Sequence, residues 1–183
     1  MLLPRLFSQR GSRKVRVSSS SSDFSQNRWG PAMRSTANVT ARTVEPVLTE
    51  RTKAVIVVHQ GGMPADVQPI RKLVAGSGVL VFEDAACAAG SWFAGRPGGY
   101  GAEMAAWSFH PRKLLTTGEG GMITTERADW AATLRRLREH GMSVSAADRH
   151  AATERVVLEE YLEVGFNYRM TDIQAAVGLV QLA

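Results

Sequence analysis

Three side chains in the middle of the chain have the types and order needed for covalent chemistry. Asp84 follows one apolar run, and Ser108 and Lys113 follow another. A lysine amine can condense with an aldehyde when its surroundings favour the neutral amine, and Arg112 places a positive charge beside Lys113. A carboxylate keeps a cationic ring nitrogen protonated, and a serine hydroxyl suits a phosphate. Asp, Ser and Lys in this order are therefore what pyridoxal phosphate needs.

Each of these residues also has a plainer interpretation when it is taken alone. An aspartate after a strand commonly caps a helix or forms a turn, and a lone lysine is usually a solvated surface charge. The glycine-rich run Gly118–Gly121 indicates a tight turn and matches neither common nucleotide-binding glycine motif. The spacing by itself leaves the function open.

The elements that must position these residues alternate between strands and helices. Apolar runs predict buried strands over residues 54–58 and 79–82, and the second delivers Glu83 and Asp84 at its carboxyl end. Between them, apolar residues recur with helical spacing from Val67 to Val74, and Gly76 is expected to end that helix.

The same alternation continues toward the end of the chain. A strand is predicted over residues 104–109 after a glycine-rich connection over residues 90–101, and another over residues 122–125. Helices are predicted from about residue 128 to 140 and from Thr171, whose hydroxyl can cap it. This order predicts an α/β fold with a mostly parallel sheet covered on both faces.

Composition limits the remaining possibilities. The chain has 183 residues, 44% of them hydrophobic, which suits one domain with a sizeable core. Its single cysteine, Cys87, excludes an internal disulfide framework, and its four histidines lack metal-ligand spacing, so no metal site is expected. No apolar stretch is long enough to span a bilayer. We therefore expect a soluble, cytoplasmic protein.

The positive charge is concentrated at the amino terminus. Residues 1–34 carry a net charge of +6 against +5 for the whole chain, so the remainder is close to −1 and gives no reason to expect nucleic acid. Residues 1–34 are rich in arginine and serine and are expected to be a disordered leader. A transit peptide and a nucleic-acid-binding arm are the two alternatives for this segment.

Five ordered motifs resemble those of the DegT/DnrJ/EryC1/StrS aminotransferases, a family of sugar aminotransferases with the type I pyridoxal-phosphate fold. They are VHQGGMPAD at residues 58–66, EDAACA at 83–88, SFHPRK at 108–113, TGEGGM at 117–122 and GFNYRM at 165–170. The resemblance covers residues 37–183 and implies a three-layer large domain of the type I fold.

The resemblance also implies a role for each site residue. Lys113 would hold pyridoxal 5'-phosphate as a Schiff base and move protons, Asp84 would pair with the pyridine nitrogen, and Ser108 would bind the phosphate. Asn167 would reach the phosphate of the neighbouring subunit's cofactor, which implies a homodimer with a shared active site. The alternative for Asn167 is a turn residue that leads into the last helix.

The chain departs from the family pattern at several points. Cys87 stands where many members have a glutamine whose amide bonds the 3′-oxygen of the cofactor, and a thiol is a weaker partner. Glu103 stands where an aspartate is common and is expected to be structural. Residues 1–34 contain nothing like the family's glycine-threonine phosphate loop or stacking aromatic ring. Residues 35–183 are therefore expected to be a partial large domain, truncated at both ends.

The resemblance implies transfer of an amino group, commonly from glutamate, to a keto-sugar nucleotide. The presence of Lys113 argues against the dehydratase branch of the family, which has histidine there. Two other hypotheses remain at this point: a catalytically inactive remnant, and a regulatory or binding protein that uses the basic leader.

Overall fold

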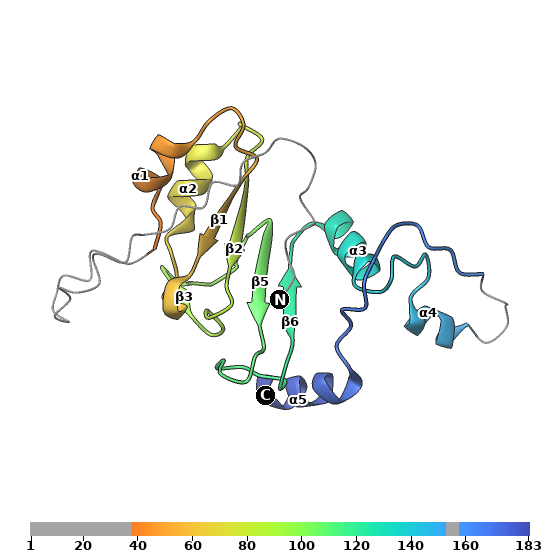
Figure 1. The fold of residues 1–183 in the computed structure, drawn as a ribbon. Helices are drawn as coiled ribbons and strands as arrows, with labels where there is room; N and C mark the ends of the chain where they lie inside the picture. Colours follow the sequence, from red (N-terminus) through yellow and green to blue (C-terminus); the bar gives the residue numbers. More distant parts are fainter. Residues whose placement is uncertain (1–37, 153–157) are drawn as a thin grey trace. The chain divides into compact units, whose positions relative to one another are not determined.

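The structure, a computed structural model, describes residues 38–152 and 158–183. The predicted leader over residues 1–34 lies outside the described residues. The chain divides into two compact units, Met1–Ser108 and Phe109–Ala183. Each unit is described by itself, and Figure 1 shows the elements of both.

The first unit is built on a parallel sheet. Strand β1 (Ala54–Val58) pairs with β2 (Leu80–Asp84), and β2 pairs with β5 (Met104–Ser108), in both cases in parallel. Helix α2 (Val67–Val74) lies between β1 and β2 in the chain, as parallel pairing requires of a crossover connection. The predicted α/β fold with a mostly parallel sheet is confirmed.

The second strand is longer than the sequence pattern indicated. Glu83 and Asp84 belong to β2 because both still pair with the neighbouring strands: Asp84 lies opposite Val58 of β1 and Ala106 of β5. The chain therefore leaves the sheet only after Asp84.

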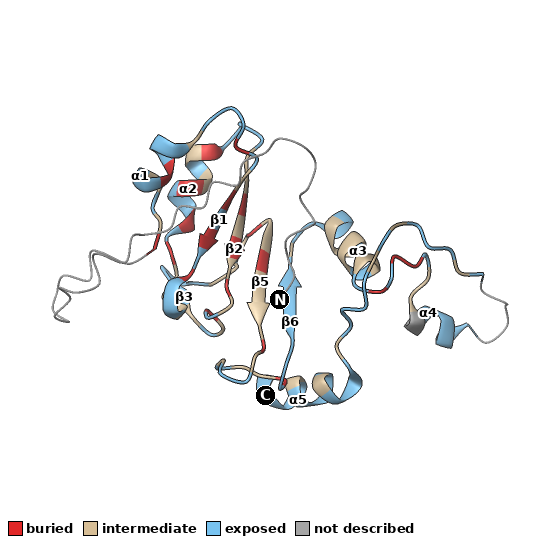
Figure 2. Ribbon diagram, in the orientation of Figure 1, coloured by how far each residue is buried: buried red, intermediate tan, exposed pale blue. Residues whose placement is uncertain are grey.

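The hydrophobic core of this unit lies between α2 and one face of the sheet. Val57, Ile70 and Val81 are completely buried, and Val44 of the short helix α1 (Ala41–Val44) closes the cluster. Figure 2 shows the buried residues of β1, β2 and α2 in red. Burial of each such side chain stabilises the fold by about 1.5–3 kcal/mol.

The opposite face of β1 is exposed in the described residues, so the prediction of a fully buried strand is wrong. Ile56 and Val58 are 58% and 42% exposed, while Val55 and Val57 alternate with them on the buried face. A run of β-branched residues is equally apolar on both faces. It therefore predicts a strand without showing which face is covered.

The glycine-rich connection contains a hairpin that the sequence pattern did not indicate. Strands β3 (Trp92–Phe93) and β4 (Arg96–Pro97) pair antiparallel around Ala94 and Gly95, which both have positive φ angles of 49° and 77°. Two-residue hairpin loops favour this backbone, but Asn-Gly or Asp-Gly usually marks them. The Ala-Gly pair is not such a signal, so the sequence pattern does not predict this hairpin. The described part of this unit also contains two short 3₁₀ turns, η2 (Glu45–Val47) and η3 (Gln60–Gly62).

The second unit contains one strand and three helices among its described residues. They are β6 (Gly121–Thr124), α3 (Ala128–Leu137), α4 (Ala146–Ala151) and α5 (Asp172–Leu182). The first helix ends at Leu137, earlier than its predicted end at residue 140. The carbonyls of Leu137 and Arg138 accept hydrogen bonds from the amides of Phe166 and Tyr168, and His140 has a positive φ of 58°.

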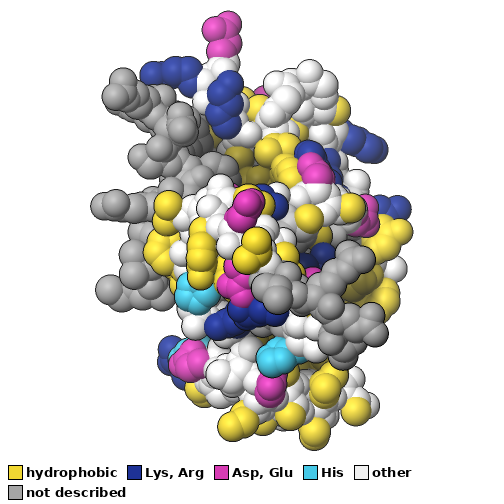
Figure 3. All heavy atoms as spheres, turned by 90° about the vertical axis from the view of Figure 1, so that its right-hand side faces the viewer, with side chains coloured by type: hydrophobic (Ala, Val, Ile, Leu, Met, Phe, Trp, Pro, Cys, Tyr) yellow, Lys and Arg dark blue, Asp and Glu magenta, His cyan; other side chains and the backbone are white. Residues whose placement is uncertain are grey.

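The last helix begins where the sequence predicted. Thr171 caps α5, since its hydroxyl accepts from the Gln174 amide at 3.3 Å and the Gln174 side chain accepts from the Thr171 amide at 2.9 Å. Ile173, Val180 and Leu179 on this helix are at least 72% exposed. Figure 3 shows exposed hydrophobic side chains, in yellow, on one face of the molecule. Among the described residues, no helix is long and apolar enough to cross a membrane.

We expect the core between α2 and the sheet to dominate the stability of the first unit. Ile70→Ala should lower the free energy of unfolding by about 2–5 kcal/mol, because Ile70 is completely buried. Ile56→Ala, the same substitution on the exposed face, should cost less than about 1 kcal/mol. Chemical denaturation of both variants measures the difference, and equal losses would contradict the assignment of the core.

Candidate functional site

Asp84 is held at the carboxyl end of β2 by hydrogen bonds on both sides. The His59 amide donates to the Asp84 carbonyl at 3.0 Å, and the Ala85 amide donates to the Ala106 carbonyl at 2.9 Å. The Asp84 side chain is half-buried, and its Oδ1 accepts from the Ala86 amide at 3.1 Å. The turn that follows the strand thereby orients one carboxylate oxygen, while Oδ2 has no hydrogen-bond partner among the residues that the structure describes.

Ser108 lies at the same edge of the sheet. It is the last residue of β5, two residues beyond Ala106, which lies opposite Asp84. Ligands of open α/β sheets bind beyond the carboxyl ends of the strands. The structure thus brings two of the four predicted site residues, Asp84 and Ser108, to the edge where a ligand is expected.

Lys113 belongs to the second unit and lies in a loop with a closed base. The Lys113 amide donates to the His110 carbonyl at 2.9 Å, which forms a turn. At the base, the Phe109 amide donates to the Gly120 carbonyl at 2.9 Å, and the Thr117 amide donates to the Phe109 carbonyl at 3.2 Å. Phe109 and Thr117 are buried, so the base of the loop is anchored, and the Lys113 side chain is half-buried.

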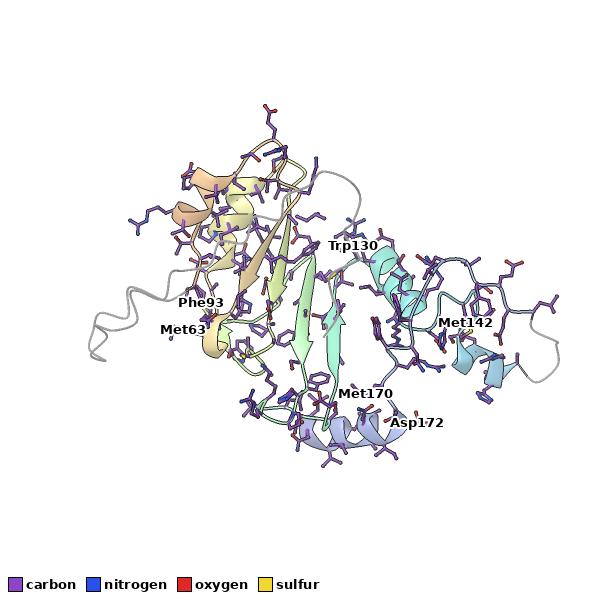
Figure 4. All side chains as sticks on the ribbon, in the orientation of Figure 1. Met63, Phe93, Trp130, Met142, Met170 and Asp172 are labelled. Carbon is purple, nitrogen blue, oxygen red and sulfur yellow. The ribbon has the colours of Figure 1, made fainter. Side chains whose placement is uncertain are left out.

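Helix α5 supports this loop from one side. Gln174 Nε2 donates to the Glu119 carbonyl at 2.8 Å, and Gln181 Oε1 accepts from the Thr116 amide at 3.4 Å. A Cβ on Gly178 would stand 3.1 Å from the Thr117 methyl group, so the helix approaches closely. Figure 4 shows Met170 and Asp172 where the chain enters α5. The loop that carries Lys113 therefore depends on a helix that starts about 60 residues later in the chain.

Asn167 lies on a different segment of the second unit. Its backbone bridges to Glu139, and its exposed side chain accepts from Arg169 Nε at 3.2 Å. Arg169 in turn donates to Glu139 at 3.2 Å. A local role in the turn before α5 is therefore present, and the role in a shared active site stays a prediction.

A buried polar cluster beside Asp84 was not singled out by sequence reasoning. Glu83, His59 and Arg71 join through hydrogen bonds of 2.9 Å, and Glu83 and His59 are 3% and 2% exposed. The available signal was that His59 directly follows β1 and Glu83 is the second-last residue of β2, both at positions that alternate onto the buried face. Glu103, expected to be structural, lies 4.0 Å from Arg71 on the margin of this cluster.

A cavity of about 380 Å³ opens on the helix-covered side of the first unit. Its lining includes His59 and Glu83 together with Phe93 of the hairpin, which Figure 4 labels. Asp84 and Ser108 do not line it. The edge residues and the cavity are therefore distinct features of this unit.

The edge residues suit pyridoxal phosphate. Asp84, the last residue of β2, offers a carboxylate oxygen, as a pyridinium nitrogen requires, and Ser108 offers a hydroxyl to a phosphate. Lys113 offers an amine from an anchored loop. Cys87 is exposed and lies in the turn after Asp84. Among the described residues, no group of three or more His, Cys, Asp or Glu side chains could hold a metal ion.

The chain is similar to aminotransferases. The model of the DegT/DnrJ/EryC1/StrS aminotransferase family matches residues 32–183. Helicobacter pylori PseC, an aminotransferase involved in the biosynthesis of pseudoaminic acid, is 30% identical, with a TM-score of 0.70 over 80% of this chain and 37% of that chain.

Two further solved structures are similar. DesI, determined in the presence of its TDP-sugar product, is 33% identical, with a TM-score of 0.65 over 80% of this chain and 34% of that chain. Spr1654 from Streptococcus pneumoniae, in its PLP-form, is 27% identical, with a TM-score of 0.66 over 80% of this chain and 40% of that chain. The chain thus spans between 34% and 40% of the length of these three proteins.

We expect Gln174 to stabilise both α5 and the loop that carries Lys113. Gln174→Ala removes the side-chain half of the capping box and the hydrogen bond to Glu119. The free energy of unfolding should fall by about 1 kcal/mol, and hydrogen exchange at the amides of residues 116–120 should become faster. Gln68→Ala on α2, an exposed glutamine, is the matched control. Unchanged exchange in the loop would contradict the supporting role.

Proposed function

Because the chain belongs to the DegT/DnrJ/EryC1/StrS aminotransferase family, we propose that it is a pyridoxal-phosphate-dependent aminotransferase. The reaction would transfer an amino group from a donor such as glutamate to a keto-sugar nucleotide. The observation that carries this proposal is the position of Asp84 and Ser108 at the carboxyl ends of two adjacent parallel strands.

Pyridoxal phosphate, when bound, supplies an electron sink for the transfer of amino groups. Asp84 would hold the proton on the ring nitrogen with the carboxylate oxygen that the Ala86 amide leaves open. Ser108 would donate a hydrogen bond to the phosphate. Lys113 would attach the cofactor as a Schiff base and, when released, would take up and return a proton at the substrate carbon.

The similar structures support the class of substrate. DesI was determined with a TDP-sugar product, and PseC acts in the biosynthesis of pseudoaminic acid. We extend to this chain a keto-sugar nucleotide as amino acceptor and a cytoplasmic location. We also extend to it a homodimer in which the exposed Asn167 side chain contacts the cofactor of the other subunit.

We expect purified chain mixed with pyridoxal phosphate to show the visible absorbance of a lysine-bound cofactor. Borohydride reduction followed by peptide mass spectrometry should place the cofactor on Lys113. Lys113→Ala should abolish the absorbance, because no other described lysine lies in the loop that follows β5.

Lys53→Ala, which removes an exposed lysine before β1, is the matched control and should keep the absorbance of the wild-type chain. The proposal is contradicted if the wild-type chain lacks the absorbance or carries the cofactor on a different lysine.

A keto-sugar nucleotide should convert the absorbance of the cofactor only after preincubation with an amino donor. Glutamate should change the spectrum of the bound cofactor in the wild-type chain, and Asp84→Asn should slow that change by about 100-fold or more, since an amide does not hold the ring nitrogen protonated. Stopped-flow absorbance measures the rate. If glutamate leaves the spectrum unchanged and another amino acid changes it, that amino acid is the donor in place of glutamate.

A further inference from the structure

We propose that Glu83, His59 and Arg71 form a positioning network that sets the orientation of the Asp84 carboxylate toward the cofactor ring. This inference rests on the proposed function, in which Asp84 pairs with the ring nitrogen. None of the three residues is proposed to touch the cofactor; they act through Asp84.

Three donors converge on one buried carboxylate. Glu83 Oε2 accepts from His59 Nε2 at 2.9 Å and from the Gly99 amide at 2.8 Å, and Glu83 Oε1 accepts from Arg71 Nη2 at 2.9 Å. These donors come from the residue that follows β1, from α2 and from the loop after β4. Glu83 thereby ties three separate segments to the end of β2.

The hydrogen-bond pattern assigns the form of the histidine ring. His59 Nδ1 accepts from the Ala65 amide at 3.0 Å, so it carries no hydrogen. The ring hydrogen is therefore on Nε2, which donates to Glu83. The imidazole is neutral, and the charge of the buried carboxylate is balanced by Arg71, which also donates to the Gly101 carbonyl.

The network reaches Asp84 by two routes, one covalent and one through hydrogen bonds. Glu83 and Asp84 share a peptide unit, and their side chains point to opposite faces of the sheet. His59 holds both residues, because its ring binds the Glu83 carboxylate while its amide donates to the Asp84 carbonyl at 3.0 Å. A movement of Glu83 must therefore tilt the peptide that carries Asp84.

Core packing alone does not account for a carboxylate at this position. Val81 occupies the equivalent position two residues earlier on the same face and is completely buried. An apolar residue would fill this face without the desolvation that a buried ion pair requires. A fully hydrogen-bonded carboxylate adds directional constraints that an apolar contact lacks, and these constraints fall on the residue next to Asp84.

The direct test compares variants of His59 for their effect on bound pyridoxal phosphate. His59→Phe keeps a ring but loses the donor to Glu83, and we expect it to raise the dissociation constant of pyridoxal phosphate about tenfold. It should also move the pH midpoint of the visible absorbance. That midpoint reports the proton of the Schiff-base nitrogen, whose acidity depends on whether Asp84 keeps the ring nitrogen protonated.

His59→Gln places an N–H donor where Nε2 lies and should restore most of the affinity and the wild-type midpoint. Arg71→Met is a second, independent variant at the margin of the core, expected to change both quantities in the same direction as His59→Phe. It keeps the proposal testable if His59→Phe does not fold.

A purely structural role is separated by Val44→Ala, which removes buried volume from α1 outside the network. This control should lose stability while keeping the affinity and the midpoint of the wild-type chain. The proposal is overturned if His59→Phe and Arg71→Met lose stability but keep the wild-type dissociation constant for pyridoxal phosphate and the wild-type pH midpoint.

The failure of the proposed function gives a different result. In that case, the wild-type chain itself shows no absorbance of a lysine-bound cofactor, and the positioning role is rejected together with the proposed function.

Discussion

The hydrogen-bonded carboxylate of Glu83 is the constraint on which the first unit depends. It sits inside the unit where an apolar side chain would be the ordinary choice, and it accepts from His59, Arg71 and the Gly99 amide. A buried charge tolerates little displacement of its partners, since a lost partner leaves the charge uncompensated. The end of β1, the helix α2 and the loop after β4 are therefore held in one arrangement around the end of β2.

That arrangement explains how the sheet edge presents chemistry. Parallel pairing brings the ends of β2 and β5 together, so Asp84 and Ser108 share one edge although 24 residues separate them in the chain. In the second unit, the loop of Lys113 is anchored by its own buried base and by α5. Each proposed contact with the cofactor thus comes from backbone that other elements hold in place, as precise catalytic geometry requires.

Much of the fold could be predicted because local patterns dominate it. The strand over Ala54–Val58, the helix that begins at Val67 and the capped helix after Thr171 all follow from periodicity and capping residues. Predictions failed where a distant contact decided the outcome. Helix α3 ends at Leu137, where the amides of a later segment donate to the carbonyls of Leu137 and Arg138, and the hairpin around Ala94 forms without the usual turn residues.

The sequence by itself determined the family, through five ordered motifs, and the residue types at the candidate site, Asp84, Ser108 and Lys113. Side-chain chemistry and spacing along the chain are local properties, so they can be recognised without coordinates. Only the tertiary structure decided that His59 and Arg71 meet Glu83, from 24 and 12 residues away. Such contacts depend on strand register and on the packing of α2, which set distances that no local pattern encodes.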